Sequence, residues 1–214
     1  MLKCRLLYRK EFESRYISHL DLMRVFRRSF ARAKLPLVFS QGFNPHPYLS
    51  VPLPLPTGFD SECDLLDFDL DLEEMPEDLL ERLNAAFPHG VSGQKVYLRT
   101  RGGGDIAAAS YRVSLTGEGF DVESVHKLFT SGPIVMMKRT KRGETEEDIT
   151  RFIRKLGVEE MPGGVVIRAT LAAGNESLNP EYLTKAVQMI EGAKIGCAQY
   201  CRTAILDAKL KEFA

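Results

Sequence analysis

Residues 40–58, SQGFNPHPYLSVPLPLPTG, carry side chains that could bind a ligand or transfer a proton. They combine the amides of Gln41 and Asn44 with the imidazole of His46, and five prolines stiffen the backbone around them. A second imidazole, His19, lies earlier in the chain. Because an imidazole can act as a general acid or base near neutral pH, His19 and His46 are candidate catalytic residues. Two histidines without an assignable nucleophile or metal ligand are weak evidence for catalysis.

The elements around this stretch predict where it lies. Residues 3–10 alternate as a strand does, a helix begins at Ser18 with Asp21 completing a capping box, and residues 36–40 form a short apolar strand. In a βαβ unit the helix starts at the sheet edge where the following strand ends. We therefore expect one edge, with an anion-binding helix start, to gather six side chains: Arg15, Ser18, His19, Gln41, Asn44 and His46. The alternative is a proline-rich connection that only crosses the surface.

Two basic clusters could contact nucleic acid through phosphates. The first recurs along the helix as Arg24, Arg27, Arg28 and Arg32, and the second comprises Lys138, Arg139, Lys141 and Arg142. The alternatives are a solvated helix face and a charged ribbon tip balanced by the acids that follow it. Charge is uneven along the chain: residues 1–58 hold ten Lys/Arg against three Asp/Glu, and residues 59–82 hold one Arg against eleven Asp/Glu.

A row of carboxylates, Asp67, Asp69 and Asp71, lies on one side of a predicted strand over residues 63–72. Such a row could bind Mg²⁺ or Ca²⁺. The pattern favours cross-strand pairs with the basic residues of the first strand, Lys3, Arg5 and Arg9. That acidic face would also lack the exposed aromatic side chains with which an RNA-recognition motif stacks bases.

No metal site, cofactor or membrane segment is predicted. Cys197 and Cys201 lack a second pair or a nearby histidine, and there is no Walker A or G-x-G-x-x-G motif after a strand. No apolar run approaches the ~20 residues that cross a bilayer. The charged N-terminus is unlike a signal peptide, and four scattered cysteines suit a reduced compartment. We expect a soluble cytoplasmic protein, and the sequence leaves its oligomeric state open.

The order of elements predicts an α+β fold with antiparallel sheets. Residues 1–100 read as β-α-β-β-α-β, the ferredoxin-like split βαβ arrangement, with the proline-rich loop inside it. A glycine-rich linker or flexible hairpin follows at 100–110. The order then repeats over residues 108–214, with strands at 133–140 and 163–173 and an inserted segment at 141–160 between them. Two tandem ferredoxin-like units result.

The motif SHLDLMRVFRRSFARAKLPLVFSQGFNPHPYLSVPLPLPTG resembles the radical-SAM-linked protein family, and the resemblance covers residues 1 to about 205. This prokaryotic domain of unknown function is found beside, or fused to, a radical S-adenosylmethionine protein. The resemblance implies a radical SAM partner that performs the chemistry, because this chain lacks the C-x₃-C-x₂-C cluster motif. The family's genes tend to lie near those for a ribonuclease and ribosomal proteins, which hints at RNA.

Three functions stay open. The first is an accessory or substrate-presenting binding protein that works with a radical SAM enzyme, with possible RNA contact. The second is an RNA-processing endonuclease of tandem ferredoxin-like type, in which His19 or His46 would be the base for 2′-hydroxyl attack. The third is an assembly protein whose acidic and basic strips meet between copies.

Overall fold

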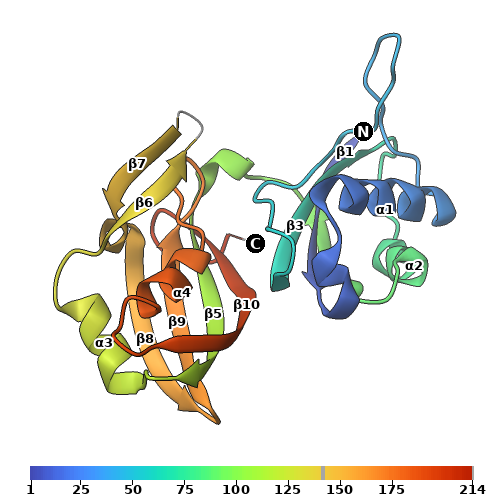
Figure 1. Ribbon diagram of the computed structural model, residues 1–214. Coiled ribbons are helices and arrows are strands. Elements are labelled where there is room, and N and C mark those ends of the chain that lie inside the picture. The colour runs from blue at the N-terminus through green and yellow to red at the C-terminus, as the bar shows by residue number, and fades with distance from the viewer. Residues whose placement is uncertain (141–142, 214) are drawn as a thin grey trace. The chain divides into compact units, whose positions relative to one another are not determined.

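The chain divides into two compact units (Figure 1). This computed structural model describes residues 1–140 and 143–213, and it leaves the side chains of residues 139 and 140 undescribed. Unit 1 comprises residues 1–105 and unit 2 residues 106–213. The division made from sequence placed the two units at 1–100 and 108–214.

Unit 1 contains a small antiparallel sheet and two helices. In chain order its elements are β1 (Leu2–Lys10), a 3₁₀ turn η1 (Phe12–Tyr16), α1 (His19–Arg32), β2 (Leu49–Ser50), β3 (Asp60–Leu70), α2 (Leu79–Ala86), β4 (Val91–Leu98) and a 3₁₀ turn η2 (Gly103–Asp105). The strands lie in the order β4-β1-β3-β2, and each pairing is antiparallel.

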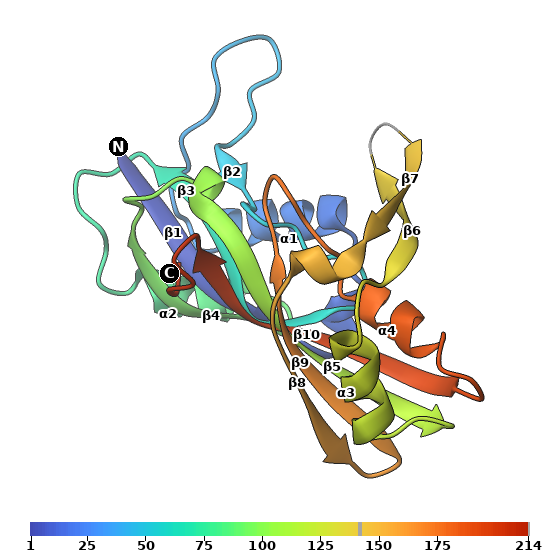
Figure 2. The same ribbon diagram turned by 90° about the vertical axis from the view of Figure 1, so that its left-hand side faces the viewer.

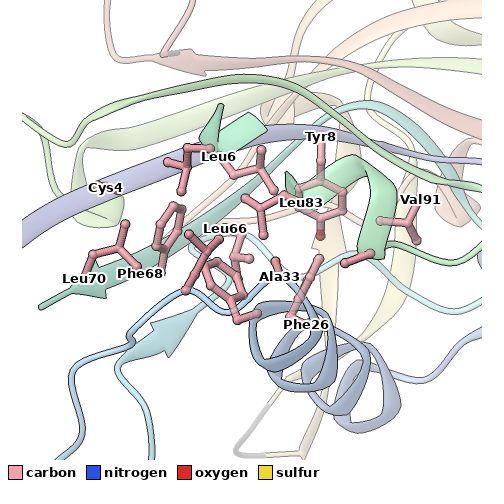
Figure 3. Packing of buried hydrophobic residues seen from close by; sticks show 14 of the residues in the cluster. Cys4, Leu6, Tyr8, Phe26, Ala33, Leu66, Phe68, Leu70, Leu83 and Val91 are labelled. Atoms are coloured by element: carbon pink, nitrogen blue, oxygen red, sulfur yellow. The ribbon is translucent and has the colours of Figure 1, made fainter. Parts of the chain in front are cut away.

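The core of unit 1 lies between one face of this sheet and the two helices (Figure 3). The buried side chains of α1 recur at helical spacing and include Leu22, Phe26 and Phe30. They meet alternate residues of β1 and β3, and the ring of Tyr8 packs edge-on against Phe26 with centroids 5.2 Å apart. A period of about 3.6 on the helix and of 2 on the strands thus produces one shared apolar layer.

Unit 2 repeats the same order of sheet strands and adds a hairpin. Its elements are β5 (Ile106–Glu118), α3 (Val122–Thr130), β6 (Val135–Thr140), β7 (Gly143–Asp148), a 3₁₀ turn η3 (Ile149–Phe152), β8 (Ile153–Met161), β9 (Gly164–Ala172), α4 (Glu181–Val187) and β10 (Lys194–Asp207). Its sheet has the order β10-β5-β9-β8, with antiparallel pairings, whereas β6 and β7 pair with each other.

Two predictions for unit 2 are wrong. The predicted second strand, 133–140, belongs to the separate β6–β7 hairpin, and the second strand of the sheet is β8, within the segment expected to be an insertion at 141–160. The apolar residues of β8 are spaced irregularly among charged neighbours, with only Leu156 and Val158 between its two ends, which explains why periodicity missed it. The predicted linker at 100–110 also ends early, because β5 begins at Ile106 and Ala108 and Ala109 are buried.

The expected fold class is confirmed as α+β with antiparallel sheets. Across the part of the chain that the structure describes, no helix is both long and apolar enough to span a membrane.

Candidate binding site at the interrupted strand

The strand that follows α1 is interrupted by a loop. Leu37 forms a bridge to Leu70 of β3, and β2 then pairs with Phe68 and Asp67 of β3. Between these two contacts the chain leaves the sheet as residues 39–47, which we call the 39–47 loop. In both views this loop, the light blue segment after α1, stands out beyond the sheet of unit 1 (Figures 1 and 2). Of the predicted strand at 36–40, residues 37 and 38 pair with β3, and the prediction is wrong for the residues that follow.

Three backbone hydrogen bonds close the base of the loop. The N–H of Val38 donates to the carbonyl of Asp69 at 2.9 Å, and the N–H of Asp69 donates to the carbonyl of Tyr48 at 3.3 Å. The N–H of Tyr48 in turn donates to the carbonyl of Val38 at 2.9 Å. We call this set the loop junction. It satisfies backbone groups that an interrupted strand would otherwise leave unpaired.

The stem of the loop is held by Ser40 and His46. The N–H of Ser40 donates to the His46 carbonyl at 2.8 Å, and the N–H of His46 donates to the Ser40 hydroxyl at 3.1 Å. The same hydroxyl lies 2.9 Å from Nδ1 of His46. Proline at 45 and 47 further restricts the stem. His46 thus has a structural role in this loop, because its ring, backbone N–H and carbonyl all bond to Ser40.

The tip of the loop exposes an aromatic side chain. Phe43 is fully exposed, and it is preceded by Gly42, whose φ of 127° lies in a region that favours glycine. Gln41 and Asn44 flank it and are also exposed. A rigid loop that carries an exposed phenylalanine between two amides offers one apolar anchor and polar groups for orientation.

A cavity of about 190 Å³ lies at the foot of the loop. One wall is the returning chain, residues 46–50, and the other is formed by β3 and by one arginine that follows β4. The side chains that bring charge to this cavity are Asp67, Asp69 and Arg99.

An ion-pair cluster forms the charged side of this cavity. Arg5, which is 1% exposed, binds Asp67 in a bidentate manner, with Nε–Oδ1 at 2.6 Å and Nη2–Oδ2 at 2.9 Å. Arg99 lies 3.1 Å from Asp67 and 3.6 Å from Asp69. Burial lowers the pKa of Arg5, but the hydrogen bond and charge of Asp67 outweigh it, so the pKa is raised overall. The charges balance. The predicted pairing of the Asp row with the first strand is confirmed for Arg5 with Asp67 and for Lys3 with Asp69, but not for Asp71, which lies beyond β3, or for Arg9, at an irregularity of the register.

This arrangement suits binding better than catalysis. Arg99 is a quarter exposed and has N–H groups left for a carboxylate or a backbone carbonyl, while Tyr48 and Ser50 add hydroxyl groups. No group of three His, Cys, Asp or Glu side chains able to hold a metal ion occurs among the residues that the structure describes.

The predicted convergence of the two histidines is wrong. Arg15 forms an ion pair at 3.1 Å with Asp60, the first residue of β3, and its carbonyl accepts from the N–H of Gly58. His19 opens α1 just beyond this segment, whereas His46 lies by the loop junction at Asp69. Residues 60 and 69 are about 30 Å apart along a strand. The expectation failed because the loop leaves the sheet near the start of the strand after α1 rather than at its end.

The start of α1 is already occupied by a carboxylate. The Ser18 hydroxyl caps the helix by accepting from the N–H of Asp21, and it donates to the Asp21 carboxylate at 2.7 Å. Arg24 also binds Asp21, and the hydrogen bond from Ser18 followed by that from Arg24 lowers the pKa of Asp21. The negative charge that a helix N-terminus favours is therefore supplied by the chain itself.

The basic stripe is only partly available. Arg24 is engaged by Asp21, and Arg32 donates to the Ala86 carbonyl at the end of α2. Arg27 and Arg28 remain exposed on α1. In the second cluster Lys138 pairs with Glu147 at 3.0 Å and lies over the ring of Phe152. The Arg139 side chain, Lys141 and Arg142 lie outside what the structure describes.

Sequence reasoning missed Phe43, Tyr48 and Arg99 as members of this site. Phe43 and Tyr48 lie within the proline-rich stretch 40–58, so their place in the sequence was a usable signal. Arg99 had no local signal, because its role depends on the register between β1, β3 and β4.

The chain belongs to the family described as "Uncharacterized protein conserved in bacteria (DUF2344)", whose model matches residues 3–180. No curated protein matches the chain in sequence. A similar solved structure is the "Crystal Structure of a Cbf5-Nop10-Gar1 Complex", with 13% identity and a TM-score of 0.47. The match covers 86% of this chain but 45% of the other, so this chain spans less than half of that protein's length.

We predict that Ser40→Ala loosens the 39–47 loop while leaving the rest of unit 1 folded. Removing the hydroxyl deletes two bonds to His46, and each such hydrogen bond contributes about 1 kcal/mol. Limited chymotrypsin digestion, which cuts after Phe43, should proceed several-fold faster than in the wild type. Ser92→Ala, at an exposed position of β4, is the matched control. Equal cleavage rates in all three proteins would contradict the proposed role of Ser40.

Proposed function

We propose that this chain is an accessory binding protein that engages a protein partner through the 39–47 loop and the cavity at its foot. The observation that carries the proposal is Phe43, a fully exposed aromatic side chain at the tip of a braced loop. The chemistry, in this proposal, belongs to the partner.

The energetics of Phe43 favour a docking role. Burying a phenylalanine side chain contributes about 1.5–3 kcal/mol, and this contribution is forgone in the isolated chain. Aromatic anchors of this kind dominate the binding energy of many interfaces. Because Ser40, His46 and two prolines already order the loop, little conformational entropy would be lost when a partner closes around it.

The partner we propose is a radical SAM enzyme encoded nearby. The resemblance of residues 18–58 to the radical-SAM-linked proteins supports this choice. The four cysteines of this chain are scattered over both units, and Cys4 and Cys201 are buried. An iron–sulfur cluster would then be held by the enzyme, and this chain would present a substrate or position the enzyme.

We further propose that each unit is a variant of the ferredoxin-like fold. The shared strand orders β4-β1-β3-β2 and β10-β5-β9-β8 support this assignment. In unit 1 the variation is the loop that interrupts the strand after α1, and in unit 2 it is the β6–β7 hairpin. Both insertions occur between the first helix and the third sheet strand of their unit.

The other two functions have less support. The endonuclease hypothesis needs one histidine free to act as the base for 2′-hydroxyl attack. The ring of His46 is bonded to Ser40, and His19 is exposed at the start of α1. The assembly hypothesis relied on acidic and basic strips meeting between copies. Within unit 1, Arg5 binds Asp67 and Arg15 binds Asp60, so part of the basic segment is already paired with the acidic segment of the same chain.

Phe43→Ala should weaken binding to the radical SAM enzyme encoded beside this gene, by roughly tenfold or more, because it removes the apolar anchor. Isothermal titration calorimetry of the two purified proteins measures the change. Tyr16→Ala, which removes another exposed aromatic at the opposite end of β3, should bind as the wild type does. Unchanged affinity for Phe43→Ala would contradict a docking role for the loop, and no binding by any of the proteins would contradict the choice of partner.

RNA contact is a separate prediction that rests on Arg27 and Arg28. The double variant Arg27→Ala/Arg28→Ala should bind a mixed-sequence single-stranded RNA more weakly. The slope of log affinity against log salt should fall by about 1.5, the value for two lost phosphate contacts. Fluorescence anisotropy across a salt series measures both changes. Lys209→Ala/Lys211→Ala, which removes two exposed charges from unit 2, is the control. RNA binding that is absent, or equally strong in both variants, would overturn this prediction.

A further inference from the structure

Strand β8 forms one edge of the sheet of unit 2. It pairs with β9 on one side, and it ends the strand order β10-β5-β9-β8 (Figure 2). Among the described residues of unit 2, no strand pairs with its outer side. An edge strand presents a row of backbone N–H and C=O groups on which another strand can form a ladder.

The charges along β8 are arranged for a second copy of the same strand. The central sequence is RKLGVEE, from Arg154 to Glu160. If two such strands pair in antiparallel register about Gly157, Lys155 of one lies opposite Glu159 of the other. Leu156 lies opposite Val158, and Arg154, at the irregularity between Ile153 and Lys155, comes near Glu160. Each opposed charge is of opposite sign, and the two-fold symmetry of a homodimer repeats every contact twice.

The surroundings of these residues leave them accessible. Lys155, Gly157 and Glu159 are exposed. Glu159 accepts from Arg168 at 2.8 Å, and Arg154 donates to the Arg151 carbonyl, but a carboxylate and a guanidinium each have further bonding capacity. Among the described residues, a Cβ added at Gly157 would meet no atom within 4 Å, so no side chain covers the face of the sheet at this position.

A protective role for these charges is the competing explanation. Charged residues on edge strands often prevent pairing, because they would be buried or opposed by like charges. Protection against self-pairing works best when one sign of charge runs along the edge. Here the basic residues occupy one half of β8 and the acidic residues the other, so antiparallel self-pairing brings opposite signs together.

We propose that two copies of this chain form a dimer through antiparallel pairing of their β8 strands, centred on Gly157. The five residues from Lys155 to Glu159, which lie in the regular part of the strand, supply roughly four to six backbone hydrogen bonds. The charge pairs fix the register and direction, while each exposed pair contributes little strength by itself. The dimer is therefore concentration-dependent and weaker at high salt. This inference does not depend on the proposed function of the 39–47 loop.

Reciprocal charge reversal tests the register directly. Arg154→Glu/Lys155→Glu makes β8 acidic throughout, and Glu159→Lys/Glu160→Lys makes it basic throughout. Each variant alone then opposes like charges, and its dimer dissociation constant should rise at least roughly tenfold. In an equimolar mixture of the two variants every opposed pair is again of opposite sign, so a mixed dimer should form.

Analytical ultracentrifugation of the full chain gives the readout. We expect the wild type, and a Lys209→Glu/Lys211→Glu control away from β8, to sediment at twice the chain mass of 24.0 kDa at high concentration. Each β8 variant should sediment as a monomer with a wild-type circular dichroism spectrum, and their mixture should regain the doubled mass. A monomeric wild type, dimers in either single preparation, or a monomeric mixture would overturn the proposal.

Discussion

The hydrogen bonds at the loop junction are the constraint on which the candidate site depends. The Asp69 carbonyl accepts a hydrogen bond from the N–H of Val38, and the Asp69 N–H donates to the carbonyl of Tyr48. One residue of β3 therefore pairs with the chain both before and after the 39–47 loop. Because these backbone groups are satisfied, the chain can leave the sheet for nine residues without leaving unpaired groups at the edge. The side chain of the same Asp69 lies by Arg99 in the cavity. Asp69 therefore holds the base of the loop through its backbone and contributes charge to the cavity through its side chain.

Features that repeat locally could be predicted from the sequence. Alternation in residues 3–10 and 63–72 placed Leu6, Leu66 and Phe68 on one face and the charged residues on the other, and the structure confirms both faces. The helical spacing of Leu22, Phe26 and Phe30 was equally clear. The pairing of the basic side chains of β1 with the Asp row was also predicted, because both lie on the same face of neighbouring strands. The particular partner of Arg5 was not, because registers two residues apart also oppose unlike charges.

Features that depend on distant pairing could not be predicted. The apolar run PLVFS predicts a strand whether or not that strand continues past Val38. Where it stops depends on the backbone hydrogen bonds to Asp69, thirty-one residues further on. The wrong choice of β6 instead of β8 as the second strand of the unit 2 sheet has a similar cause. Val135 and Met136 looked more strand-like than Leu156 and Val158, but β8 is the strand that pairs with β9. The burial of Arg5 and the placement of Arg99 likewise emerge only when three strands are aligned.

Residue-resolved amide hydrogen exchange of unit 1, within the whole chain, tests the interrupted strand most directly. We expect slow exchange at Val38, Tyr48 and Gly58, whose N–H groups are bonded, and fast exchange from Gln41 to Asn44 at the tip. The contradicting result is continuous protection from Val38 through Phe43 with rapid exchange at Tyr48 and Gly58. That result would mean that the strand continues unbroken and delivers the proline-rich stretch to the start of α1.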